Sequence, residues 1–137
     1  LNSCAFAPGS YPYSEDYEIE ATEEDVKIAI NKFKKEYPDY IVPKVSINKQ
    51  GSLSMRDEQN SYWYHINFYY KDENKIIFTW TRPNGRFSTT FAFVGVNYGL
   101  DLGNSKRINS DLNWTENRSE IKKFEERILK RILENLQ

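Results

Sequence analysis

Three aromatic-rich segments, YWYHINFYY at 62–70, KIIFTWTR at 75–82 and FSTTFAFVGV at 87–96, follow one another with only short interruptions. Aromatic and β-branched side chains favour strands, and here they alternate with polar ones. The interruptions, DEN at 72–74 and PNG at 83–85, contain the residues that turns use. The three segments therefore predict an antiparallel three-stranded meander around which the rest of the chain folds.

The turn between the first two strands sets which of their side chains are neighbours. A three-residue loop at 72–74, with Asn74 in the left-handed region, suits the sequence of this turn. Such a loop sets Phe68 beside Phe78. On this register the large apolar side chains of both strands share one face, which we expect to be the core.

The second turn leaves a choice of loop length. Loops of two or four residues set Phe78 beside Phe91, whereas a three-residue loop sets Phe78 beside Thr90. Burial favours the even loops, because they complete an apolar row on the core face. Pro83 lacks the N–H that the closing pair of a two-residue hairpin uses, so we predict a four-residue loop at 83–86.

The opposite face of the predicted meander is polar between two aromatic residues. Hydroxyl, amide and imidazole groups lie there side by side, flanked by rings of the kind that anchor protein interfaces. The candidate partner-binding residues on this face are Trp63, His65, Asn67, Tyr69, Thr79, Thr81, Ser88 and Thr90. The alternative interpretation is an ordinary solvated sheet face, since threonine and serine are common on exposed strands.

Two helical patterns flank the predicted sheet. Thr22 is a suitable N-cap for a first helix that Pro38 ends, and Asn117 is a suitable N-cap for a second that continues to the C-terminus. Residues 40–56 alternate loosely and suit a short hairpin, or an edge strand and a loop. The sequence thus predicts the α+β class: an N-terminal helix, an antiparallel meander of three to five strands and a long C-terminal helix, with both helices on one sheet face.

A glycine-rich segment at 95–107 follows the predicted meander. It lacks the Gly-Lys-Ser/Thr ending of a phosphate-binding loop, and its glycines are too widely spaced for a dinucleotide-binding fingerprint. Long loops of this kind often carry binding residues. We therefore take Tyr98, Asp101 and Trp114 as secondary candidates for partner binding.

Side chains that carry catalysis or bind metals are scarce. The chain has one histidine and one cysteine, which excludes multi-histidine metal sites, thiolate clusters and an internal disulfide. Ser88 and His65 are neighbours on the predicted register, but no acidic residue stands near to orient the imidazole. We therefore expect no enzyme activity, no metal and no cofactor. A formal net charge of −1 gives no global field that would attract nucleic acid.

The chain starts with Leu1-Asn2-Ser3-Cys4, and a segment rich in proline, glycine, serine and tyrosine follows. These four residues resemble the lipobox of bacterial lipoproteins, in which an aliphatic residue three before the cysteine and a small residue just before it precede lipidation. The resemblance implies a lipid anchor on Cys4 and a location in the bacterial cell envelope, on the periplasmic or surface side. We expect residues 1–17 to form a flexible tether and residues 18–137 a single domain.

These observations lead to two hypotheses about function. The first is a lipid-anchored envelope protein that binds another protein without catalysis, as inhibitors and immunity proteins do. It would use the polar sheet face and the glycine-rich loop. The second is a small-ligand-binding module with a pocket between helix and curved sheet, in which Trp80, Tyr64 and Tyr70 would line the cavity.

Overall fold

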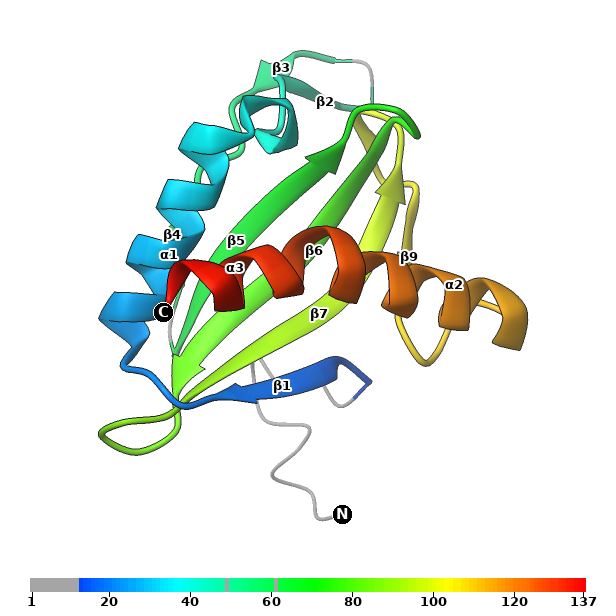
Figure 1. The fold of residues 1–137 in the computed structure, drawn as a ribbon. Helices are drawn as coiled ribbons and strands as arrows, with labels where there is room; N and C mark the ends of the chain where they lie inside the picture. Colours follow the sequence, from blue (N-terminus) through cyan, green and yellow to red (C-terminus); the bar gives the residue numbers. More distant parts are fainter. Residues whose placement is uncertain (1–12, 49, 61) are drawn as a thin grey trace.

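Two helices lie across one face of an antiparallel sheet in the computed structural model, which describes residues 13–48, 50–60 and 62–137 (Figure 1). The predicted α+β class is therefore confirmed. The lipobox-like residues and the tether up to residue 12 lie outside the described residues. In chain order the elements are β1 (Glu15–Ile19), α1 (Glu23–Glu36), the 3₁₀ turn η2 (Pro38–Tyr40), β2 (Val45–Ile47), β3 (Ser52–Leu53), β4 (Glu58–Asn60), β5 (Trp63–Tyr70), β6 (Lys75–Pro83), β7 (Thr89–Tyr98), β8 (Asp101–Leu102), β9 (Ser105–Arg107), α2 (Trp114–Phe124), the π-helical segment η3 (Glu125–Leu129) and α3 (Lys130–Asn135).

The main sheet is built around the predicted meander and has the strand order β1-β7-β6-β5-β4. Strands β1 and β9 pair with successive parts of the same β7 edge. Strand β1 was not predicted, and its residues 15–17 fall in the segment expected to be tether. The alternation of apolar and polar residues in β1 covers only a few positions. Tyr17 and Ile19 pack on the core, while Glu18 lies on the other face.

Helix α1 begins and ends where the sequence predicts. The hydroxyl of Thr22 accepts a hydrogen bond from the N–H of Asp25 at 3.1 Å, and the helix ends before Pro38. The buried stripe consists of Val26, Ala29, Ile30 and Phe33.

The C-terminal helix is continuous from α2 through η3 to α3 (Figure 1). It begins earlier than predicted, because Asn113 is the N-cap and accepts from the N–H of Glu116 at 2.9 Å. Asn117, the predicted cap, instead exchanges hydrogen bonds with Asn109. Within the described residues, no helix is both long and apolar enough to cross a membrane.

The register of the first hairpin differs from the prediction by one residue. A four-residue turn at 71–74 replaces the predicted three-residue loop, so Phe68 lies opposite Ile77 and not beside Phe78. Asn74 adopts the expected positive φ, 51°. The predicted register is wrong because β6 is apolar on both faces, and alternation alone could not decide which face the core takes.

The second hairpin is offset as well. A five-residue loop at 84–88 replaces the predicted four-residue loop, and Phe78 lies opposite Gly95 instead of Phe91. A β-bulge follows Phe78, where β7 contains one extra residue. Both register shifts have the same effect on β6. Phe68 and Phe91 stay in the core as predicted, while the side chains of β6, the strand between them, point to the opposite faces from those predicted.

Both faces of the sheet are buried, although to different extents. The face beneath the helices holds the main core, which includes Ile30, Phe33, Ile66, Phe68, Phe91, Phe93, Phe124, Ile128 and Ile132. The opposite face holds two smaller apolar clusters, one around Trp63 and Trp80 and one around Tyr69 and Ile76. The face expected to be polar is therefore largely apolar.

Strands β2 and β3 pair antiparallel as in the short hairpin that the sequence allowed, and β8 joins β2 in parallel. This small sheet lies at the same end of the molecule as the turn between β5 and β6 (Figure 1). Val45 of β2 packs on Tyr69 and Ile76, which explains why this part of the second face is buried.

Candidate functional site

The eight residues predicted to share one face are divided between two faces. Because β6 is turned over, Thr79 and Thr81 lie on the helix side and are buried. The Thr79 hydroxyl donates to the carbonyl of Ile66 at 2.8 Å, and the Thr81 hydroxyl donates to the carboxylate of Glu23 at 3.1 Å. The first bond joins β6 to β5 within the sheet, and the second joins β6 to α1.

Ser88 and His65, which were predicted to be neighbours, do not lie side by side. His65 lies opposite Trp80, whereas Ser88 belongs to the loop at 84–88 beyond the end of β6. Burial lowers the pKa of His65, and Glu58 on the neighbouring strand partly offsets the effect. Ser88 is therefore not positioned for His65 to activate it. Among the described residues, there is no cluster of three or more histidine, cysteine, aspartate or glutamate side chains that could hold a metal ion.

The other four predicted residues keep their face, but little of it is open to solvent. Trp63, Asn67 and Tyr69 are 5%, 7% and 8% exposed. The hydroxyl of Thr90 donates to Glu18 of β1 at 2.7 Å. What remains of the predicted surface is a cavity of about 250 Å³ lined by His65, Asn67, Phe78, Thr79 and Val94.

The three loop candidates lie on separate elements. Asp101 in β8 accepts a hydrogen bond from Ser46 at 2.9 Å, which joins the parallel strands of the small sheet. Tyr98 ends β7 and is 38% exposed. Trp114 is the first residue of α2 and is 73% exposed, with the guanidinium of Arg118 over its ring. Trp114 is therefore an accessible aromatic side chain, but no pocket among the described ones includes it.

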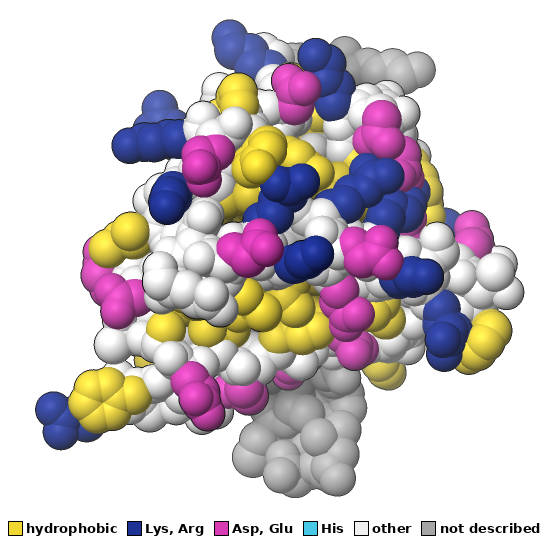
Figure 2. Space-filling model, in the orientation of Figure 1, with side chains coloured by type: hydrophobic (Ala, Val, Ile, Leu, Met, Phe, Trp, Pro, Cys, Tyr) yellow, Lys and Arg dark blue, Asp and Glu magenta, His cyan; other side chains and the backbone are white. Residues whose placement is uncertain are grey.

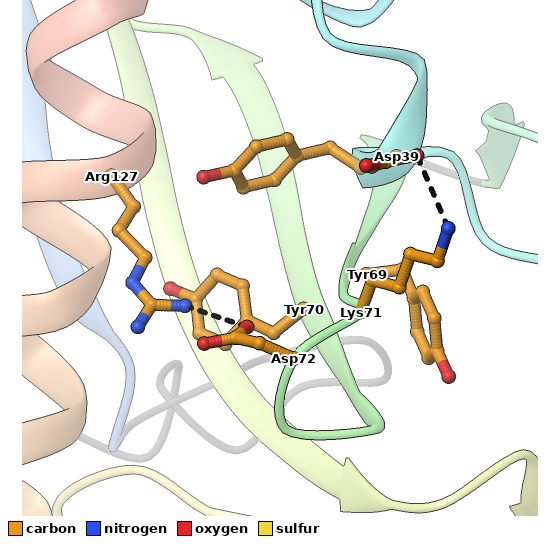
Figure 3. Close-up of a pocket in the computed structure, with 7 residues that line it drawn as sticks. Asp39, Tyr69, Tyr70, Lys71, Asp72 and Arg127 are labelled. Atoms are coloured by element: carbon orange, nitrogen blue, oxygen red, sulfur yellow. Dashed lines mark hydrogen bonds and ion pairs between the residues drawn. The ribbon is translucent and has the colours of Figure 1, made fainter.

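A larger pocket, which sequence reasoning missed, lies between η2, the β5–β6 turn and η3 (Figure 3). It has a volume of about 500 Å³ and is lined by Asp39, Tyr40, Tyr69, Tyr70, Lys71, Asp72 and Arg127. We call it the tyrosine–arginine pocket. Its residues come from three segments far apart in the sequence, and only their tyrosines carried any signal before the fold was known.

Arg127 is fixed on one side of this pocket. Its guanidinium lies 4.9 Å from the centroid of the Tyr70 ring and pairs with Asp72 at 3.1 Å and with Glu73 at 3.2 Å. Figure 3 shows it reaching over Tyr70 toward Asp72, while Lys71 and Asp39 face each other across the opposite rim. Arg127 belongs to the π-helical segment, a local widening that is frequent at functional sites.

A charged network beside the pocket holds Glu73 in place. Glu73 accepts hydrogen bonds from Lys75 at 2.9 Å and from Lys123 at 2.6 Å, and Lys75 also bonds to the buried Glu120. Burial alone would raise the pKa of Glu73, but the hydrogen bonds from the two lysines outweigh it and lower the pKa to about 2. Burial alone would lower the pKa of Lys75, but its hydrogen bonds to Glu120 and Glu73 outweigh this effect and raise the pKa.

A third feature lies at the opposite end of the sheet, where the β6–β7 loop projects beside the start of α1 (Figure 1). Phe87 in this loop is 72% exposed, and Ile28 of α1 is 56% exposed. Both line a groove of about 550 Å³, together with Glu20, Ala21, Thr22, Asp25, Ala29, Lys32, Asn135 and Leu136. We call it the loop-end groove. On the helix-bearing face, Figure 2 shows basic and acidic side chains intermixed, with hydrophobic ones between them.

Comparison with protein-family models, with characterised proteins and with solved structures found no match for this chain.

Proposed function

We propose that this protein is a non-catalytic protein-binding module of the bacterial cell envelope, comparable in role to inhibitors and immunity proteins, and held there by a lipid on Cys4. The observation that carries the proposal is Phe87, a phenylalanine in the β6–β7 loop that is 72% exposed and lines the loop-end groove together with the exposed Ile28. Exposed aromatic side chains beside a concave surface are typical anchors of protein interfaces.

The binding surface that we propose is the loop-end groove, in place of the sheet face expected from the sequence. Trp63 and Tyr69 on that face are almost entirely buried, so they cannot serve as anchors without unfolding. Tyr62, immediately before β5, is by contrast 73% exposed. It lies at the end of β5 that pairs with the last part of β6, which is also the end from which the β6–β7 loop projects.

The charges around the loop-end groove define the kind of partner. Glu20 and Asp25 line it together with Lys32, and the exposed Glu24 is next to Asp25 in the first turn of α1. The guanidinium of Arg86 lies 5.5 Å from the centroid of the Phe87 ring, so three carboxylates face two cations. No salt bridge within the described residues neutralises these three carboxylates. The partner should therefore present a basic segment carrying one large apolar side chain that fits against Phe87 and Ile28.

Capture from envelope extract with the full chain tests this proposal. Phe87→Ala should weaken binding of the captured partner about thirtyfold, the loss typical of a central anchor. The double charge reversal Glu24→Lys with Asp25→Lys should slow association and remove its salt dependence. Ile47→Ala is the control, because Ile47 is an exposed apolar side chain, 48% exposed, that lies on β2 away from the groove. Equal capture by wild type, Phe87→Ala and the charge-reversed variant would contradict the proposal.

The anchor is tested separately. Mass spectrometry of the full-length protein from membranes should show acyl chains on Cys4, as the resemblance to a lipobox implies. An unmodified Cys4 would remove the anchor from the proposal and leave protein binding at the loop-end groove to be judged by the capture experiment.

Small-ligand binding is the second candidate function, and the tyrosine–arginine pocket favours it. Of the three residues expected to line such a cavity, Tyr70 does so. Trp80 lies on the opposite face of the sheet in the cluster around Trp63, and the ring of Tyr64 is covered by Lys27 with its amine 4.2 Å from the centroid. The cavity is therefore at one end of β5 and not beneath the centre of the helices.

A further inference from the structure

We propose that the tyrosine–arginine pocket binds a neutral sugar, with Tyr40 as the stacking surface and with Asp39, Lys71, Asp72 and Arg127 as the hydrogen-bonding groups. The inference rests on the second candidate function and gives it a ligand class. It does not depend on protein binding at the loop-end groove.

The charges of the pocket cancel in pairs. Lys71 and Asp39 lie 3.7 Å apart, and Arg127 and Asp72 lie 3.1 Å apart. A ligand with net charge would have to separate one of these ion pairs or lie next to a side chain of the same charge. A neutral ligand does neither, so the pocket favours neutral over anionic or cationic compounds.

The paired groups still have hydrogen-bonding capacity to offer. A carboxylate has roughly four acceptor positions and a guanidinium five N–H donors, and each pair uses only part of them. Asp39, Lys71 and Asp72 keep 73%, 71% and 63% of their side-chain surface exposed. The pocket thus presents donors and acceptors alternately along its rim, which matches the hydroxyl groups of a sugar, since each hydroxyl both donates and accepts.

An aromatic wall completes the match. The rings of Tyr40 and Tyr70 stand at 86° with centroids 6.3 Å apart, and Arg127 covers the face of Tyr70. Tyr40 is only half-buried and is held from behind by Phe33, whose centroid lies 4.8 Å away. The negative face of such a ring attracts the weakly positive C–H groups on the flat side of a pyranose.

The pocket is also large enough and fixed in shape. Its volume of about 500 Å³ falls within the range of ligand sites and would hold one or two sugar rings. Arg127 is held by two carboxylates and one ring, so a ligand need not order it on binding.

Titration of the isotope-labelled full chain with sugars, followed by amide NMR, tests the inference. The probes are glucose, N-acetylglucosamine and the disaccharides cellobiose and chitobiose, with acetate and glucose 6-phosphate as charged comparisons. We expect saturable shifts at residues 39–41, 69–72 and 127 with at least one neutral sugar, and weaker or no shifts there with the charged probes. No saturable shift with any neutral sugar, or tighter binding of a charged probe, overturns the proposal.

Variants locate the site without disturbing the fold. Asp39→Ala with Lys71→Ala removes an exposed ion pair and should weaken sugar binding about fivefold to tenfold. Lys122→Ala with Glu126→Ala removes a similar exposed pair on the C-terminal helix and should change nothing. Equal loss in both double variants, or in neither, overturns the assignment. Phe87→Ala should leave sugar binding intact, which separates this test from that of protein binding.

Discussion

Replacing Glu73 by glutamine should lower the stability of the domain in a pH-dependent manner. Glu73 lies in the β5–β6 turn and connects it to the C-terminal helix through Lys123 at 2.6 Å and Arg127 at 3.2 Å. It also pairs with Lys75 of β6 at 2.9 Å. The substitution keeps the size of the side chain and removes its charge, so packing is preserved while three ionic contacts lose their negatively charged partner.

The magnitude follows from the pKa of this carboxyl. A decrease in pKa from 4.5 to about 2 corresponds to at most about 3.4 kcal/mol of stability. Because the side chain keeps 23% of its surface exposed, we reduce this for solvent screening to about 1–2 kcal/mol. The folded-state pKa is lower than the unfolded one, so the contribution is complete above pH 4.5 and is lost as pH falls toward 2.

Urea denaturation of the wild type and of Glu73→Gln, followed by tryptophan fluorescence between pH 7 and pH 3, measures this difference. The difference in unfolding free energy should shrink by about half or more between pH 5 and pH 3. Glu126→Gln serves as control, since Glu126 pairs with Lys122 at 4.0 Å on an exposed helix face, and its effect should stay below about 0.5 kcal/mol. A loss for Glu73→Gln that is the same at every pH would refute an electrostatic origin.

Three further substitutions test the packing. Gly95→Ala should destabilise the domain by about 1–3 kcal/mol in chemical denaturation, because a Cβ there would lie 2.6 Å from a backbone oxygen of β9, whereas Gly51→Ala, with no atom within 4 Å, should be nearly neutral. Phe124→Ala should cost about 3–5 kcal/mol, since this fully buried ring packs against two phenylalanines of β7, while Trp114→Ala should cost less than about 0.5 kcal/mol; similar melting temperatures for these two variants would contradict the assigned core. Thr79→Val should cost about 1 kcal/mol, because it removes the hydrogen bond of a buried hydroxyl to the carbonyl of Ile66, and no change in unfolding free energy would instead favour the predicted position on the other sheet face.

The elements with strong local signals could be predicted from the sequence. Thr22 caps α1 as expected, and the meander has its three strands where the aromatic segments lie. The N-cap of the C-terminal helix was misplaced because Asn113 and Asn117 are equally suitable caps by sequence alone. Their roles differ only through Asn109, which occupies the side chain of Asn117.

The orientation of β6 could not be predicted, since it depends on what covers the second face of the sheet. The predicted three-residue loop at 72–74 set Phe78 beside Phe68, and so placed Phe78 and the residues that share its face, such as Ile76, in the main core. The structure instead covers them with residues of the small sheet, such as Val45 and Leu102, which are distant in sequence. The local sequence of a strand does not show whether residues distant in the chain cover one of its faces.

The tyrosine–arginine pocket was missed for a related reason. It brings together residues 39–40, 69–72 and Arg127, and none of these segments has a motif of its own. The doubled tyrosines at 69–70 were the one available signal. They were assigned to opposite strand faces, correctly, but the closeness of η2 and η3 to that strand end appears only in the fold.

The division of one β7 edge between β1 and β9 also bears on how the protein avoids self-association. With a formal net charge of −1 and a sequence pI of about 5.9, mutual repulsion between copies is weak near neutral pH. Unpaired strand edges would then be the main route to aggregation. The longest strand has both edges occupied, and the outermost strand on the other side, β4, is three residues long and includes a glutamate. The pairing of both β7 edges therefore closes the longest described strand to a further strand, which the charge of the molecule would do little to repel.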